Sequence, residues 1–214
     1  MKLSTLYAAI GLAFLATNAI AGTPAVTFDS LNSVILAPSH SNRGFEFQAT
    51  TKTYVTALGS LTRGVGSSPV QVGLWNSDGT LLASANVTQS SATLNQFSYS
   101  SIGAVALTAG SDYYVASVGY TAYGYDPVNA NTAPQIAWIQ DAFNYNGGSL
   151  SWPNATDYIH TPYGWYGANF QISAAPPPAI PEPETYAMLL AGLGLIGFIA
   201  YRRKNDSSDM PMAA

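Results

Sequence analysis

The chain has 214 residues, of which 8% are charged and 12% aromatic, a formal net charge of −4 and no cysteine. The lack of cysteine excludes disulfides, thiolate nucleophiles and Cys-ligated zinc, and the seven Lys and Arg residues, four of them near the chain ends, argue against a nucleic-acid partner. Since 48% of the residues are apolar, disorder is also disfavoured, and the composition is typical of a β-rich exported protein.

Residues 1–21 have the features of a signal peptide. Lys2 precedes an apolar run over residues 6–15, and Ala19-Ile20-Ala21 places small residues where signal peptidase requires them. We therefore predict cleavage after Ala21, so that Gly22 begins the mature protein. The alternative is an uncleaved N-terminal anchor, for which the apolar run is short.

Residues 22–173 carry many short strand patterns and no helical period. The predicted strands are residues 45–49, 54–58, 70–75, 81–87, 96–100, 104–107, 113–120, 135–139 and 168–172. Between the third and fourth of these, Asn76-Ser77-Asp78-Gly79 predicts a hairpin turn. Many short strands without intervening helices predict one all-β ectodomain, with antiparallel sheets packed as a β-sandwich or jelly roll.

The C-terminal region begins with a proline-rich linker over residues 174–180. An apolar stretch over residues 186–201 follows it, and three basic residues, at positions 202–204, come next. By the positive-inside rule the basic residues lie in the cytoplasm, which predicts a short transmembrane helix over residues 186–201 and a cytoplasmic tail over residues 205–214. These 16 residues extend about 24 Å as a helix, less than the roughly 30 Å of a bilayer core. A buried core helix is the alternative.

The order of Pro181, Glu182 and Pro183, an apolar segment with glycines, and then Arg202 and Arg203 resembles the PEP-CTERM sorting signal of Gram-negative bacteria that make extracellular polysaccharide. The resemblance covers residues 181–204. It implies recognition by an exosortase, a membrane protease that would cut near Pro-Glu-Pro. The protein would then be anchored transiently in the inner membrane and would end at the cell surface or outside the cell. The ten residues after Lys204 depart from the family, whose signals often stop soon after the basic cluster.

Short segments of the ectodomain, among them Val72-Gly73-Leu74-Trp75 and Gly79-Thr80-Leu81-Leu82, resemble a bacterial extracellular module of unassigned function. This resemblance implies a β-sandwich and no activity.

The ectodomain has few residues that could carry catalysis: one Glu, six Asp and two His. Asp141 and Asp157, both among aromatic residues, are the pair that a glycoside hydrolase would use. The two histidines, His40 and His160, are isolated, and no Gly-x-Ser-x-Gly motif occurs. We expect no catalytic residue, no cofactor and no metal, and a structural calcium ion near residues 126–131 stays open.

Aromatic residues gather late in the ectodomain, and their rings could pack on the C–H faces of sugars. The candidate glycan contacts are Trp138, Trp152, Trp165 and Tyr166. The alternative is that these rings fill the core. The sequence predicts an exported surface or matrix protein with a non-catalytic role associated with extracellular polysaccharide and biofilm. A carbohydrate-binding module and a secreted glycoside hydrolase are the alternatives.

Overall fold

The computed structural model describes residues 22–38, 41–61, 68–88, 91–145, 148–156, 166–176 and 183–206. The chain divides into two compact units, Met1–Pro177 and Pro178–Ala214. The described part of the first unit is built from antiparallel strands and that of the second is a helix, so the prediction of an all-β fold with one C-terminal helix is confirmed. The predicted signal peptide, with Ala19 and Ala21, lies outside the described residues.

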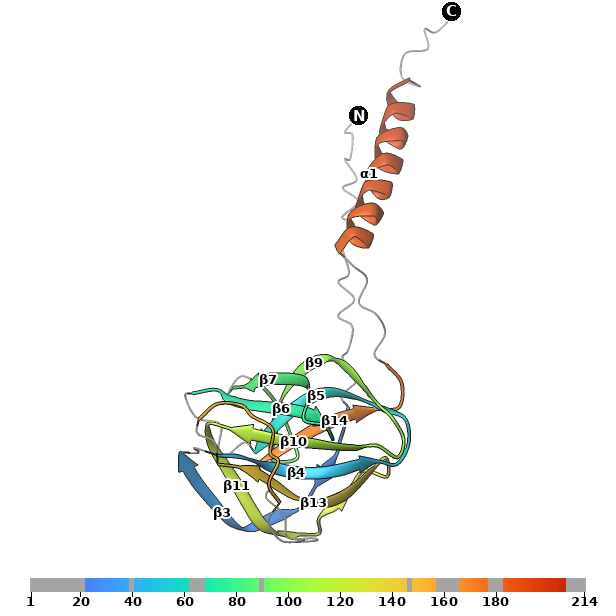
Figure 1. Ribbon diagram of the computed structural model, residues 1–214. Helices are drawn as coiled ribbons and strands as arrows, with labels where there is room; N and C mark the ends of the chain where they lie inside the picture. Colours follow the sequence, from blue (N-terminus) through green and yellow to red (C-terminus); the bar gives the residue numbers. More distant parts are fainter. Residues whose placement is uncertain are drawn as a thin grey trace, which may run out of the picture. The chain divides into compact units, whose positions relative to one another are not determined.

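Two five-stranded antiparallel sheets make up most of the first unit's described residues (Figure 1). We name each sheet after its central strand. The β5 sheet has the order β1 (Thr23–Pro24), β14 (Ala168–Ser173), β5 (Thr53–Leu61), β9 (Phe97–Leu107), β8 (Ala92–Leu94). The β10 sheet has the order β13 (Ile136–Asn144), β4 (Asn42–Ala49), β10 (Asp112–Val118), β6 (Val70–Asn76), β7 (Leu81–Val87). Two further two-stranded ribbons pair β3 (Ser30–Pro38) with β11 (Tyr120–Val128) and β2 (Val26–Thr27) with β12 (Asn131–Thr132).

The core lies between the two sheets and is rich in phenylalanine. Alternate residues of β4 point inward, so that Phe45 and Phe47 are fully buried. The ring of Phe170, on β14, lies 4.6 Å from the ring of Phe47 and 6.3 Å from that of Phe45 between centroids. Burying one such side chain contributes roughly 1.5–3 kcal/mol. These aromatic contacts hold the two sheets face to face.

The predicted hairpin turn at residues 76–79 is present between β6 and β7. Gly79 has a φ of +84°, a conformation that favours glycine, and its N–H donates to the carbonyl of Asn76 at 3.1 Å. The hydroxyl of Thr80 donates to the carboxylate of Asp78 at 2.6 Å, as does its backbone N–H at 2.9 Å. These bonds hold the pKa of Asp78 below its ordinary value, so Asp78 serves the turn.

The first strand of the fold is paired with the last. Thr23 of β1 lies opposite Ile172 of β14, and the side-chain amide of Asn169 completes the junction. Its oxygen accepts from the N–H of Val26 at 3.2 Å, and its nitrogen donates to the Val26 carbonyl at 2.8 Å and to the hydroxyl of Tyr99 at 3.0 Å. Asn169 is fully buried, so these bonds form without competition from water.

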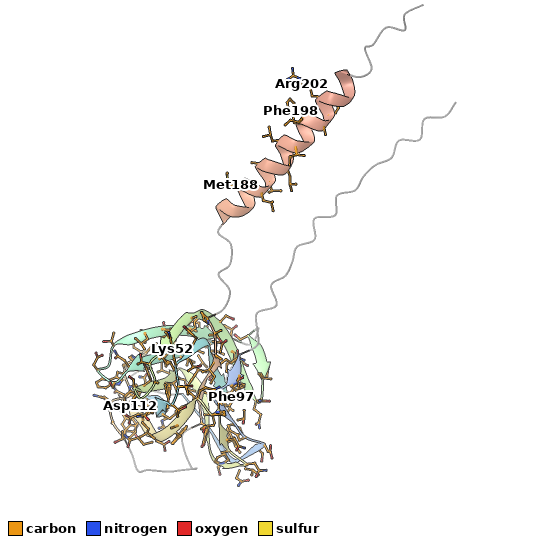
Figure 2. All side chains as sticks on the ribbon, turned by 90° about the vertical axis from the view of Figure 1, so that its right-hand side faces the viewer. Lys52, Phe97, Asp112, Met188, Phe198 and Arg202 are labelled. Atoms are coloured by element: carbon orange, nitrogen blue, oxygen red, sulfur yellow. The ribbon has the colours of Figure 1, made fainter. Side chains whose placement is uncertain are left out.

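The C-terminal helix α1 runs from Pro183 to Asp206. Its apolar side chains are exposed, including Met188 (74%) and Phe198 (61%), and Figure 2 shows them projecting from the helix. Within the part of the chain that the structure describes, none of the helices combines the length and the hydropathy of a membrane span. The prediction of a spanning helix over residues 186–201 is corrected accordingly: the helix extends beyond that range at both ends, but the added residues are largely polar or charged.

We predict that Asn169→Ala lowers the free energy of unfolding by about 3 kcal/mol, because it leaves the buried Val26 backbone groups and the Tyr99 hydroxyl without their partner. Urea denaturation of the purified protein, followed by tryptophan fluorescence, measures this loss. The matched control is Asn131→Ala, which removes an exposed amide that donates to the Asn129 carbonyl and should cost about 0.5 kcal/mol or less. Equal losses in the two variants would contradict the role given to Asn169.

Candidate functional site

A row of polar and aromatic side chains crosses the outer face of the β10 sheet. Strand register places Gln140 of β13 opposite Glu46 of β4, Glu46 opposite Tyr114 of β10, and Tyr114 opposite Trp75 of β6. Directly opposed residues lie on the same face of a sheet. Because Phe45 and Phe47 point into the core, Glu46 points outward. We call these four residues the Glu46 row.

Glu46 is only 8% exposed although it lies on the outer face. Gln140 Nε2 donates to its carboxylate at 2.5 Å, and the Tyr114 hydroxyl also bonds to Glu46. The pKa of Tyr114 is raised to about 12, chiefly by burial and further by the bond and negative charge of Glu46 and by the charge of Asp112. The row is therefore a linked set of one carboxylate, one amide and one phenol.

Residues 148–156, which we call the covering loop, are attached to the same face of the β10 sheet. Asn42 is fully buried, and its amide donates to the Ser149 carbonyl at 3.0 Å and to the Ser151 hydroxyl at 2.8 Å. Asn144, at the end of β13, donates to the carbonyl of Trp152 at 2.8 Å. Two buried asparagines thus hold the loop at one end of the sheet.

Trp152 brings the covering loop to the Glu46 row. Its ring stands edge-on to Tyr114, with centroids 5.8 Å apart and an interplanar angle of 88°. A Cβ at Gly79 would lie 2.5 Å from Cε3 of Trp152, and a Cβ at Gly73 would lie 2.4 Å from Cη2 of Trp75. Two glycines are therefore needed where the indole rings cross the sheet. Trp152 remains partly exposed, whereas Trp75 is buried.

This arrangement offers hydrogen-bonding groups beside an aromatic ring. The Gln140 amide and the Tyr114 hydroxyl, which are partly exposed, can bond hydroxyl groups, and the partly exposed indole of Trp152 can pack on apolar C–H. Within the described ranges no group of three His, Cys, Asp or Glu side chains could hold a metal ion. The groups present here are suited to hydrogen bonding and to packing on apolar C–H.

Two of the described carboxylates, Asp141 and Glu46, lie on opposite faces of the β10 sheet. Asp141 lies opposite Phe45 on the inward side of the β10 sheet and is 1% exposed. Glu46 points to the other face, so the sheet separates the two. Asp157, His40 and His160 lie outside the described residues. The side chain of Asp126, in the stretch considered for calcium, is also not described, although the backbone of residues 126–131 is.

The four candidate glycan contacts fall in different environments. Tyr166 is 3% exposed, and the partly buried Trp138 stacks on Phe45 with centroids 4.1 Å apart. Tyr166 lies in the core and has almost no surface left for a ligand. Trp138 packs against the core and keeps part of its surface. Trp152 lies on the outer face, and Trp165 is outside the described residues.

The sequence analysis did not single out Glu46, Gln140 or Tyr114 as site residues. One signal was available: Phe45-Glu46-Phe47 places the only Glu of the ectodomain between two core residues. That pattern shows that Glu46 faces away from the core. It does not show that Gln140, 94 residues away, meets it.

The sorting segment is helical from Pro183 onward. Proline is favoured in the first turn of a helix, where its missing N–H costs nothing. Arg202 and Arg203 lie in the last two turns of the helix. Pro181 and Glu182 lie outside the described residues.

We predict that Glu46→Gln lowers the pKa of Tyr114 from about 12 toward its ordinary value of 10.0, because the change removes a negative charge bonded to the phenol. Asp112→Asn should lower it less. Since the folded pKa is above the unfolded one, the unfolded state loses its proton first. The stability that Tyr114 contributes is complete below pH 10 and is lost as the pH rises toward 12.

NMR titration of protein with 13C-labelled tyrosine rings measures this pKa, with Tyr114→Phe assigning the signal. A Tyr114 pKa that is the same with and without the Glu46 charge would show that burial alone causes the shift.

Comparison with known proteins bears on the C-terminal unit. The model of the PEP-CTERM protein-sorting motif matches residues 179–204. No curated protein matches this chain. The matched residues include Pro181, Glu182 and Pro183, most of α1, and the two arginines that follow the apolar segment, which confirms the predicted sorting motif. The match supports an exported protein that is sorted by an exosortase.

Proposed function

We propose that this chain is an exported surface or extracellular-matrix protein whose C-terminal signal is cut by an exosortase near Pro-Glu-Pro. The observation that carries the proposal is the sorting motif at residues 179–204. Cleavage there would release a β-rich ectodomain with few charges. We propose a non-catalytic role for the ectodomain, in which Asp141, a carboxylate considered for hydrolysis, is 1% exposed on the inward side of the β10 sheet.

The helix α1 would hold the precursor at the inner membrane until it is cut. Support comes from its surface: Leu195, Ile196 and Phe198, which together face several sides of the helix, are each 60% or more exposed. Such a surface is stable only when apolar groups cover it. The apolar stretch is short for a permanent anchor, which fits an attachment that cleavage ends.

A second candidate function is the binding of extracellular polysaccharide at the Glu46 row. It is favoured by the contact of Trp152 with Tyr114 beside a carboxylate and an amide, since sugars offer both hydroxyl groups and C–H faces. This role would place the protein in the polysaccharide matrix of a biofilm. Of the sequence's candidate rings, it retains Trp152 and Trp165.

To test the processing, we predict that changing Pro181, Glu182 and Pro183 together to Ala leaves the exported protein with its C-terminal helix, because the exosortase loses its recognition motif. Intact-mass analysis of the exported protein measures the loss of the tail. The matched control changes Pro176, Pro177 and Pro178 to Ala, since these prolines lie outside the matched residues 179–204 and the tail should still be removed. A tail that is removed equally well in a strain without its exosortase would refute the proposal.

To test binding, we predict that Trp152→Ala weakens the affinity for the host's extracellular polysaccharide about two- to tenfold, since one stacked ring contributes roughly 0.5–1.5 kcal/mol. Titration calorimetry on the exported protein measures the affinity. Tyr54→Ala is the control, because Tyr54 is a partly exposed aromatic residue on the other sheet. Binding that survives a change of both Trp152 and Trp165 to Ala would remove this candidate function.

A further inference from the structure

The residues that follow the predicted signal-cleavage point are part of the folded core. Ala25, Val26 and Phe28 are all buried, and the ring of Phe28 stands edge-on to Phe97 and to Tyr166 at 5.6 and 5.5 Å. No spacer separates the core from the bond between Ala21 and Gly22.

Gly22 itself is enclosed by strands of the β5 sheet. A Cβ at this position would lie 2.8 Å from Cβ of Gln171 and 2.8 Å from Oγ1 of Thr56. The next residues are bonded in turn: Thr23 and Pro24 pair with β14, and the N–H of Ala25 donates to the Phe170 carbonyl at 2.8 Å. Proteases act on segments that are locally unfolded, so a bond next to a docked strand is cut only when the strand opens.

The strand that encloses Gly22 is the last one of the fold. Val26 and Asn169, which bond to each other, are 143 residues apart. Because a chain is made amino-terminus first, β1 has no partner until nearly the whole ectodomain has followed it. Contacts of such large sequence separation also form late, since closing a long loop costs entropy before it is repaid.

We infer that the fold sets the order of the two processing reactions: hydrolysis of the Ala21–Gly22 bond precedes the docking of β1 on β14, and docking then closes that bond to proteolysis. Hydrolysis consumes one water and leaves a carboxylate on Ala21 and an amine on Gly22. The inference deepens the proposed export and rests on the predicted signal peptide. It does not depend on the exosortase.

The C-terminal cut has no such restriction. Residues 174–182 separate β14 from α1, so a bond near Pro181 is several residues removed from the last paired strand. Cleavage there is compatible with a folded ectodomain. The N-terminal cut therefore belongs to the unfolded chain, and the C-terminal cut can follow folding.

The test uses the full-length precursor and purified signal peptidase in detergent. The precursor is diluted from urea, and the peptidase is added either at the moment of dilution or after tryptophan fluorescence shows that folding is complete. We expect cleavage after Ala21 to be at least about tenfold slower with delayed addition, because it then requires local opening. Cleavage at the same rate in both orders would overturn the inference.

A spacer variant separates protection by folding from other causes. Six Gly and Ser residues inserted between Gly22 and Thr23 leave the Ala21–Gly22 bond unchanged but move it away from β14. The spacer variant, with the peptidase added after folding, should be cut as fast as the wild-type precursor with the peptidase added at the moment of dilution. The control, with the same six residues between Ala175 and Pro176, should stay protected.

Slow cleavage of the folded spacer variant would also overturn the inference. If no form is cut after Ala21, the predicted signal site is wrong and the inference fails with it. The exosortase proposal is tested separately, by the C-terminal mass of the exported protein in strains with and without the exosortase, so the two proposals fail separately.

Discussion

The buried amide of Asn169 is the contact on which the ectodomain most depends. It satisfies both backbone groups of Val26 and the hydroxyl of Tyr99 in a place that water does not reach. An apolar side chain could fill the same space, but it would leave three buried polar groups without partners. In a chain that lacks disulfides, the amide thereby joins the last strand of the ectodomain to β2, near the point where the ectodomain begins.

On the outer face of the β10 sheet, glycines make room for tryptophan rings. Gly73 leaves room for Trp75, and Gly79 leaves room for Trp152. With the covering loop attached through Asn42 and Asn144, a face that would ordinarily be solvated shields a carboxylate. The β10 sheet therefore packs on both faces. The face toward the β5 sheet is largely apolar, and the face beneath the covering loop carries both polar and aromatic side chains and is partly exposed.

Much of the fold follows from local pattern, and the exceptions have physical causes. Residues 81–87 were predicted as a strand and form β7 with the same bounds. The two predicted strands 96–100 and 104–107 are one strand, β9, with an irregular register where Val55 and Ala57 of β5 face it. Gln96, which was predicted to begin a strand, is a turn residue with a φ of +67°. Glutamine rarely adopts this conformation, so the residue type gives no sign of the turn. The strands β3 and β11 were missed because serine, asparagine, glycine and proline interrupt their apolar pattern.

The last strand before the C-terminal tail is β14, and that strand lies between β1 and β5. Any force that reaches the ectodomain through its tether enters at Ser173 and runs along the axis of a strand bonded on both sides. Backbone hydrogen bonds perpendicular to the strand then share the load in shear instead of opening one after another. A pull on the tail therefore meets a strand that is paired with neighbours on both sides, not one at the free edge of the sheet.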